Sequence, residues 1–151
     1  MELSLILLVV LALVFDFLNG VHDSSNIVAT MITSRAISPR VALAMTAVAE
    51  FSGPFIFGVA VATTNGDEIV SAEFLKIEVL IAALFSAIVW NILTWLLGIP
   101  SSSSHALIGG LIGAVAVGVG FSAIKLAGVL KVLIVLFVSP IIGLIAGFLI
   151  A

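Results

Sequence analysis

Polar residues with a helical spacing interrupt the first apolar stretch of the chain, residues 3–33. Six of them are separated by three or four positions: Asp16, Asn19, Asp23, Asn26, Thr30 and Thr33. That spacing places all six on one face of a helix. Carboxylates inside a membrane are costly unless they are paired or hydrated, so they face a bundle interior or a water-filled path. A polar seam between helices is the plainer interpretation, but six polar groups exceed what a seam needs, and the pattern predicts a binding site.

A further carboxylate lies in the middle of the second apolar stretch, residues 41–62. Glu50 is followed by Ser52, Gly53 and Pro54, which can open the helical hydrogen bonding and expose carbonyl oxygens. Carboxylate and carbonyl oxygens suit a hard cation. The alternative is a protonated Glu50 that is hydrogen-bonded to a neighbour, with Pro54 as a simple kink.

The most distinctive local pattern is a run of hydroxyls before a glycine-rich apolar stretch, residues 106–120. The run follows Pro100 and consists of Ser101, Ser102, Ser103, Ser104 and then His105. The first backbone N–H groups of a helix have no partner within it, and the helix dipole favours negative charge there. A serine-capped helix start can therefore hold an oxyanion, and we predict that these five residues do so. An ordinary N-cap at a membrane edge is the alternative.

The third apolar stretch adds a weaker signal. Asn91 lies three residues before Thr94, and a structural hydrogen bond is as plausible for this pair as a ligand role. The predicted cation-binding or coupling residues are Asn19, Asp23, Asn26, Glu50 and Asn91. Of these, Asp23, Asn26 and Glu50 would be the metal ligands if the cation is sodium.

Histidines beside an acid and beside serines also permit an intramembrane serine hydrolase, in which His22 or His105 would be the base. However, the chain has no G-x-S-x-G elbow, and adjacency in sequence does not create a triad. We therefore predict that the protein is not an enzyme and needs no cofactor.

The elements that position these groups must lie in a membrane. Hydrophobic residues make up 63% of the chain and charged residues 9%, against about 25% charged residues in soluble domains. The mean hydropathy is +1.46. The formal charge of −3 suggests no nucleic-acid partner, and the absence of cysteine excludes disulfides and thiolate metal sites.

Five apolar stretches are separated by polar connectors: residues 3–33, 41–62, 72–99, 106–120 and 123–151. Since a spanning helix needs about 20 residues, we expect roughly four to five membrane segments and one transmembrane domain over residues 1–151. The first stretch lacks a basic start and a cleavage site, so we expect a retained helix. The pairs Gly109 with Gly113 and Gly143 with Gly147 predict close helix packing.

The charges in the connectors predict an orientation. The positive-inside rule places Arg35 and Arg40 in the cytoplasm, and hence the acidic turn at Asp67 and Glu68 on the opposite side. The first stretch is longer than the hydrocarbon layer is thick, so it should tilt or break, with the break at Asn19–Gly20.

For residues 101–120 we favour a re-entrant segment, which places Lys125 and Lys131 near the cytoplasmic face. A full crossing is one alternative. A hairpin that residues 101–120 form with the end of the third stretch, entering from the outer face, is another. Both alternatives put Lys125 outside.

The motifs resemble those of the PiT family of inorganic phosphate transporters, whose repeat signature reads approximately G-A-N-D-V-A-N. Residues 20–26 read G-V-H-D-S-S-N, with His22 in place of the usual asparagine, as in a bacterial branch of that family. Residues 16–40 and 100–113 are both similar to that branch. The resemblance covers nearly all 151 residues, but only about the first half of a family member, which has two inverted repeats around a central site.

This resemblance implies an all-α integral membrane protein with broken transmembrane helices and a re-entrant hairpin, one half of an inverted-repeat transporter. It implies phosphate transport coupled to Na⁺ or H⁺ in the inner (plasma) membrane. The roles of the signature residues carry over to Asp23 and Asn26, that of the hydroxyl-rich tip to residues 102–105, and that of a second-helix glutamate to Glu50. Phosphate would lie at the serines, close to Asp23.

Charge balance independently favours coupling to a cation. The five Lys and Arg residues lie in or near connectors. Like charges about 4 Å apart repel by roughly 4 kcal/mol at an effective dielectric constant of about 20, so an anion beside Asp23 or Glu50 requires a compensating cation or proton.

Other hypotheses remain open at this stage. The anion could be another oxyanion such as sulfate, or the half could lack transport activity of its own. A homo-oligomer or a second half-transporter chain would complete the site. The charge bias of the loops argues against copies of opposite orientation.

Overall fold

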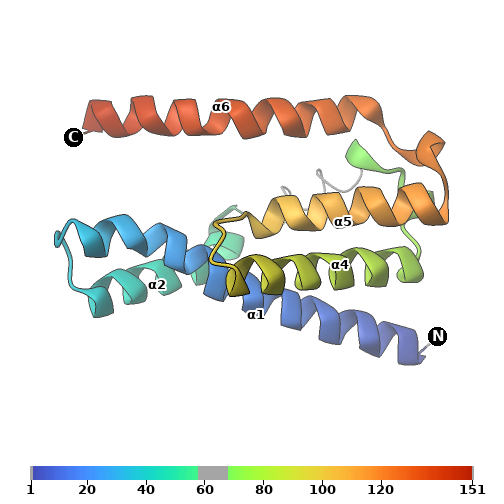
Figure 1. Cartoon of the computed structure of the whole chain (residues 1–151), viewed down its shortest axis with the longest axis horizontal. Helices are drawn as coiled ribbons and strands as arrows, with labels where there is room; N and C mark the ends of the chain where they lie inside the picture. Colours follow the sequence, from blue (N-terminus) through green and yellow to red (C-terminus); the bar gives the residue numbers. More distant parts are fainter. Residues whose placement is uncertain (1, 58–67, 151) are drawn as a thin grey trace.

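The computed structural model describes residues 2–57 and 68–150, most of which are helical (Figure 1). The helices are α1 (Glu2–Thr33), α2 (Pro39–Phe57), α4 (Ile77–Leu96), α5 (Ser103–Gly118) and α6 (Leu126–Ile150), with 3₁₀ turns η1 (Ala72–Phe74) and η2 (Phe121–Ala123). Three of them, α1, α4 and α6, are long and apolar enough to cross a membrane, whereas α5 is shorter. The predicted all-α membrane fold is therefore confirmed.

Helix α1 is continuous over 32 residues, so the predicted break at Asn19–Gly20 is wrong. A glycine weakens a helix by about 1 kcal/mol but breaks it only where another group enters the backbone hydrogen bonding. Nothing lies within 4 Å of the position that a Gly20 Cβ would take. At 1.5 Å per residue α1 is roughly 48 Å long, so it must tilt or extend beyond the hydrocarbon layer.

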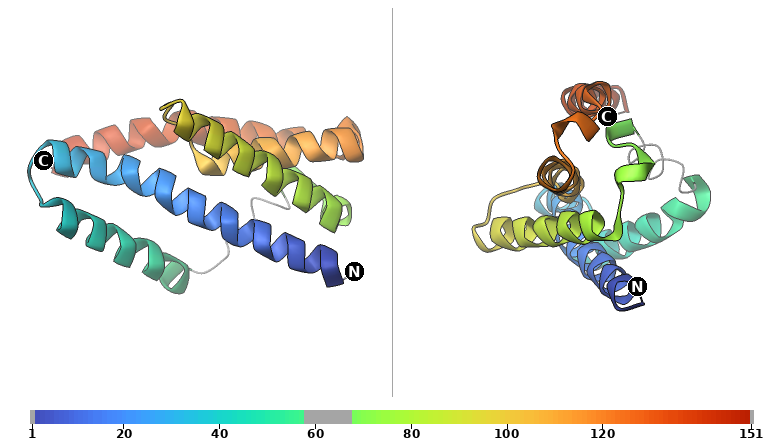
Figure 2. Two further views of the ribbon diagram at one scale, coloured as in Figure 1. Left: turned by 60° about the horizontal axis from the view of Figure 1, so that its bottom comes forward. Right: turned by 90° about the vertical axis from the view of Figure 1, so that its right-hand side faces the viewer.

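Helix α2 begins at Pro39, a residue suited to the first position of a helix, and runs back beside α1 (Figure 2). Pro54 lies inside the helix and has no N–H group, so the Glu50 carbonyl loses its usual partner four residues along. The end of the second apolar stretch lies outside the described residues, as does Asp67 of the predicted acidic turn, whereas Glu68 is described.

Helices α4 and α5 form an antiparallel hairpin that packs against α1 (Figures 1 and 2). Helix α4 ends at Leu96 with Leu97 as its C-cap, and the next residue, Gly98, has a φ of 64°, the left-handed conformation that closes many helices. The N–H of Ile99 donates to the Thr94 carbonyl, and that of Gly98 to Trp95, which completes a Schellman motif. The start of α5, just after the tip of the hairpin, contacts the second half of α1 through Ser103 and Asp23.

The hairpin returns the chain to the end of the molecule where α4 begins. The Lys125 N–H donates to the Ile69 carbonyl at 2.8 Å, and Lys131 Nζ lies 2.6 Å from Glu68 Oε1. Lys125 and Lys131 thus lie beside Glu68, so their expected separation from the acidic turn is wrong. The chain reverses at Gly98 and α5 runs back along α4, so Lys125 lies at the end where α4 begins, as both alternatives, the full crossing and the hairpin with the end of the third stretch, require.

Close packing involves different glycines from those predicted. A Cβ on Gly110 would lie 2.6 Å from the Ala83 carbonyl oxygen, so this residue allows α5 to approach α4. Nothing lies within 4 Å of the corresponding positions at Gly109, Gly113, Gly143 and Gly147. The two predicted G-x-x-x-G pairs therefore face open space within the described part of the chain.

Helix α6 is attached to the rest of the bundle near its start. A Cβ on Gly128 would lie within 2.6 Å of the Glu68 carbonyl carbon, so Gly128 allows residues 68–70 to pack on the helix. Val129 and Val132 cover a core that contains Ile69 and Val70. The most apolar part of α6, by contrast, contains no buried residue in the described structure.

Candidate functional site

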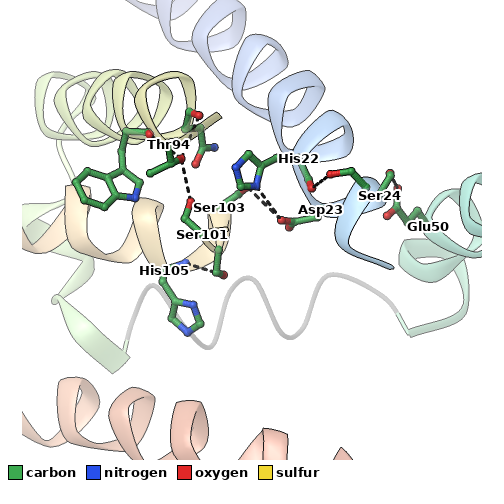
Figure 3. A network of polar contacts seen from close by, with 12 residues as sticks. His22, Asp23, Ser24, Glu50, Thr94, Ser101, Ser103 and His105 are labelled. Atoms are coloured by element: carbon green, nitrogen blue, oxygen red, sulfur yellow. Dashed lines mark hydrogen bonds and ion pairs between the residues drawn. The ribbon is translucent and has the colours of Figure 1, made fainter. Parts of the chain in front are cut away.

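Polar side chains from α1, α4 and α5 meet at the tip of the hairpin (Figure 3). The Ser103 hydroxyl donates to Asp23 Oδ1 at 3.4 Å and joins two residues that are 80 positions apart in the sequence. His22 Nδ1 lies 3.9 Å from the same carboxylate oxygen. Ser103 is fully buried, and His22 is nearly so. The structure therefore brings the signature carboxylate of α1 to the serine-rich start of α5.

The serine run forms the helix start that the sequence predicted. Ser102 is the N-cap, and its hydroxyl accepts from the His105 N–H at 3.4 Å. The Ser102 carbonyl accepts from Ala106, which begins the helical hydrogen bonding. Ser103 and Ser104 occupy the first two helical positions, whose N–H groups have no acceptor within a helix. These donors, together with the helix dipole, suit an anion.

Ser101 is attached to α4 through Thr94. The two hydroxyl oxygens are 3.0 Å apart, and Thr94 Oγ1 also lies 2.9 Å from the Trp90 carbonyl oxygen. From the sequence, a structural and a ligand role for Thr94 were equally plausible. The structure shows a buried Thr94 hydroxyl that contacts Ser101 of the serine run.

A groove of about 1140 Å³ opens beside the tip, between the α4–α5 hairpin and α6. Ser101, Ser102 and His105 line it at the tip, and Gly109 and Gly113 line it along α5. His105 and Ser104 are exposed, and the His105 ring points away from Asp23 in Figure 3. His105 thus lies on the groove side of the helix start and does not contact the carboxylate.

Two of the predicted cation ligands, Asn91 and Asn19, have buried side-chain atoms without hydrogen-bond partners. Asn91 is 2% exposed, and neither its side-chain oxygen nor its nitrogen has a hydrogen-bond partner. Asn19 Oδ1 and His22 Nδ1 are also buried and lack hydrogen bonds. A cavity of about 260 Å³ between α1 and α4 is lined in part by His22, Asn91 and Trp95.

The remaining predicted ligands lie apart from this junction. Glu50 Oε2 accepts from the Ser24 hydroxyl at 3.5 Å, a contact that joins α2 to α1. Asn26 is exposed on α1. Across residues 2–57 and 68–150, no group of three or more His, Asp or Glu side chains could hold a metal ion. Asp23, Asn26 and Glu50 therefore remain predicted sodium ligands that would need amide, hydroxyl or carbonyl oxygens beside them.

The partner of Glu50 was missed by sequence reasoning. Ser24 stands inside the signature, between Asp23 and Asn26, and its hydroxyl donates to Glu50 of α2. The available signal was its position directly after the site carboxylate, on the side of α1 that must meet the next helix.

Comparison with known proteins gives one family. The profile of the family described as "Phosphate transporter family" matches residues 19–151. A "Probable low-affinity inorganic phosphate transporter" of Mycobacterium tuberculosis (strain ATCC 25618 / H37Rv) is 46% identical over 144 residues, which are 95% of this chain and 34% of the relative. A protein of the same description from Streptomyces halstedii is 45% identical over 152 residues, 98% of this chain and 70% of the relative.

A more distant relative is the "Low-affinity inorganic phosphate transporter PitB" of Escherichia coli (strain K12), which is 37% identical over 156 residues. That match covers 94% of this chain and 31% of the relative. The chain spans about a third of the length of the mycobacterial relatives that it matches. No solved structure matches the chain.

Proposed function

Because the chain belongs to the phosphate transporter family, and thus to a family of transporters and not of enzymes, we propose that it forms the N-terminal part of a cation-coupled inorganic phosphate transporter. The anion lies at the start of α5, where unpaired N–H groups and serine hydroxyls supply donors. The observation that carries the proposal is the 3.4 Å contact between Ser103 and Asp23, because it means that a carboxylate lies beside the proposed anion-binding position.

Because the Asp23 carboxylate lies beside the proposed anion-binding position, a cation must accompany phosphate. At an effective dielectric constant of about 20, two like charges about 4 Å apart repel by roughly 4 kcal/mol. A sodium ion or a proton at Asp23 removes this repulsion, so each ligand increases the affinity for the other. The nearby groups that suit this role are the unpartnered side chains of Asn19 and Asn91, with Asn26 and Glu50 farther along α1 and α2.

The remainder of the transporter, or a second copy of the chain, completes the site. Asp16 and Asn26 are charged or polar and exposed on a membrane helix, where they need polar partners. The open groove beside the serines likewise needs a covering wall to exclude lipid. We place the assembled transporter in the inner (plasma) membrane, with the α4–α5 hairpin re-entrant.

The test is the binding of radiolabelled phosphate to the purified protein in sodium and in potassium, each at two pH values, with sulfate as competitor. We expect phosphate binding that depends on sodium or on pH and that sulfate does not displace. Ser103→Ala should weaken it about tenfold, as expected for a lost hydrogen bond near a charged ligand. Asp23→Asn should weaken it and also flatten its cation dependence.

Ser52→Ala provides the matched control, because that hydroxyl only back-bonds to Ala49 within α2. Wild-type binding that is unaffected by cation and pH would overturn coupling. Unchanged affinity in Ser103→Ala would overturn the assignment of the anion to the start of α5.

A further inference from the structure

We propose that Thr94 is a positioning residue that orients the hydroxyl of Ser101 toward the bound oxyanion. The inference deepens the proposed function and rests on it. Thr94 is a buried residue of α4 that supports the proposed anion-binding position without contacting the ligand itself.

Three oxygen atoms surround the Thr94 hydroxyl. Its Oγ1 lies 2.9 Å from the Trp90 carbonyl oxygen, 3.2 Å from the Asn91 carbonyl oxygen and 3.0 Å from Ser101 Oγ. The side chain is 4% exposed, so water does not replace these partners. Ser101 is half-buried and lines the groove.

A backbone hydrogen bond also fixes the position of Thr94 relative to the tip of the hairpin. The Thr94 carbonyl accepts from the Ile99 N–H at 2.9 Å, which closes the turn that leads to the serines. Thr94 therefore binds the tip of the hairpin twice, through its carbonyl at Ile99 and through its hydroxyl at Ser101. The position of Ser101 relative to the start of α5 depends on both contacts.

Counting protons shows what the hydroxyl contact does. A threonine hydroxyl has one proton, and a serine hydroxyl has one. If Thr94 donates to the Trp90 carbonyl, Ser101 donates to Thr94 and turns its proton away from the groove. If Thr94 donates to Ser101, the serine proton is free to point at a ligand.

An oxyanion selects the second arrangement, because its oxygens need donors. The carbonyls of Trp90 and Asn91 do not need the Thr94 proton, because within α4 they already accept hydrogen bonds from the backbone N–H groups four residues along. Thr94, Ser101 and the oxyanion then form a chain of hydrogen bonds in one direction, and each bond polarises the next. Thr94 thus converts Ser101 from a neutral structural contact into a donor for the anion.

The experiment measures phosphate binding by wild type, Thr94→Val, Thr94→Ser, Ser101→Ala and the double variant Thr94→Val with Ser101→Ala. Valine keeps the shape of threonine and removes only the hydroxyl, so we expect affinity about tenfold lower. Serine restores the hydroxyl and should bring the affinity within about twofold of wild type. The double variant should bind no more weakly than Ser101→Ala, because Thr94 acts through Ser101.

Thr33→Val is the matched control. The Thr33 hydroxyl makes the same bonds within its helix, 2.7 Å to the Ala29 carbonyl and 3.4 Å to the Thr30 carbonyl. Although its spacing places it on the predicted polar face, it lies exposed at the end of α1, ten residues after Asp23, and outside the junction with α5. This variant should bind phosphate like wild type. Melting temperatures measured alongside verify that every variant is folded.

The outcomes separate the two proposals. If wild type binds no phosphate, the proposed function fails. If wild type binds phosphate but Thr94→Val binds equally well, the function stands and the role of Thr94 is refuted. Additive losses in the double variant, or no rescue by Thr94→Ser, would show that Thr94 acts on the fold and not through Ser101.

Discussion

Replacing Gly110 with alanine tests whether the α4–α5 hairpin depends on close contact at one point. A Cβ at this position would lie 2.5 Å from Ser86 Oγ and 2.6 Å from the Ala83 carbonyl oxygen. The serine hydroxyl can rotate away, but the carbonyl belongs to the backbone of α4. Gly109, on the adjacent position of α5, has nothing within 4 Å and supplies the matched control.

The expected magnitude follows from these distances. Real Cβ contacts essentially never fall below 3.0 Å, so α5 must move away from Ala83 by at least about 0.4 Å. Overpacking of this kind costs about 1–3 kcal/mol. Alanine also gains about 0.8–1.0 kcal/mol of helix propensity over glycine, at both positions. The propensity term cancels between the two variants, so Gly110→Ala should be less stable than Gly109→Ala by about 1–3 kcal/mol.

The assay is thermal unfolding of the two purified variants in the same detergent, followed by intrinsic fluorescence. With roughly 2–4 °C per kcal/mol for a chain of this size, Gly110→Ala should melt between about 2 and 12 °C below Gly109→Ala. Its phosphate affinity should also fall, because the movement separates the start of α5 from α1. Equal melting temperatures, or a higher value for Gly110→Ala, would refute the close contact.

Three further predictions concern α6 and the buried amide. Gly128→Ala should lower the melting temperature through its clash with the Glu68 backbone, whereas Gly143→Ala, with open space around it, should not. Lys131→Met should change stability by less than about 1 kcal/mol in chemical denaturation, since its ion pair with Glu68 is solvent-exposed. Asn91→Leu should raise the melting temperature, because an unpaired buried amide costs about 1–3 kcal/mol, and should abolish the cation dependence of phosphate binding. A less stable Asn91→Leu protein would contradict the unpaired state of the amide.

Much of the fold could be predicted from the sequence because membrane helices must be long and apolar. The polar connectors predicted where one helix ends and the next begins, and the serine run predicted the start of α5. The direction of α5 could not be predicted in the same way. It depends on the reversal at Gly98 and on the pairing of residues 68–70 with residues 124–125, and hydropathy reports neither contact.

The residue types of the candidate site could be read from the sequence, but their arrangement only in part. Helical spacing placed Asp23 on a polar face, and the serine run predicted the start of α5, where we propose that the anion binds. Which serine meets Asp23 was not readable, because that contact depends on how the hairpin packs against α1. Helical spacing likewise grouped Asp23 with Asn26, which the structure leaves exposed.

The contact between Asp23 and Ser103 also sets a delay during synthesis. The two residues are 80 positions apart, so at 5–20 residues per second the ribosome makes Ser103 roughly 4–16 s after Asp23. Throughout this interval the carboxylate has emerged but lacks its hydroxyl partner. Helix α6, whose most apolar part contains no buried residue in the described structure, can enter lipid as soon as it is made. The Asp23 half of α1 must instead stay hydrated or held by the insertion machinery until α5 arrives, which makes this half the slowest part of the chain to settle in the bilayer.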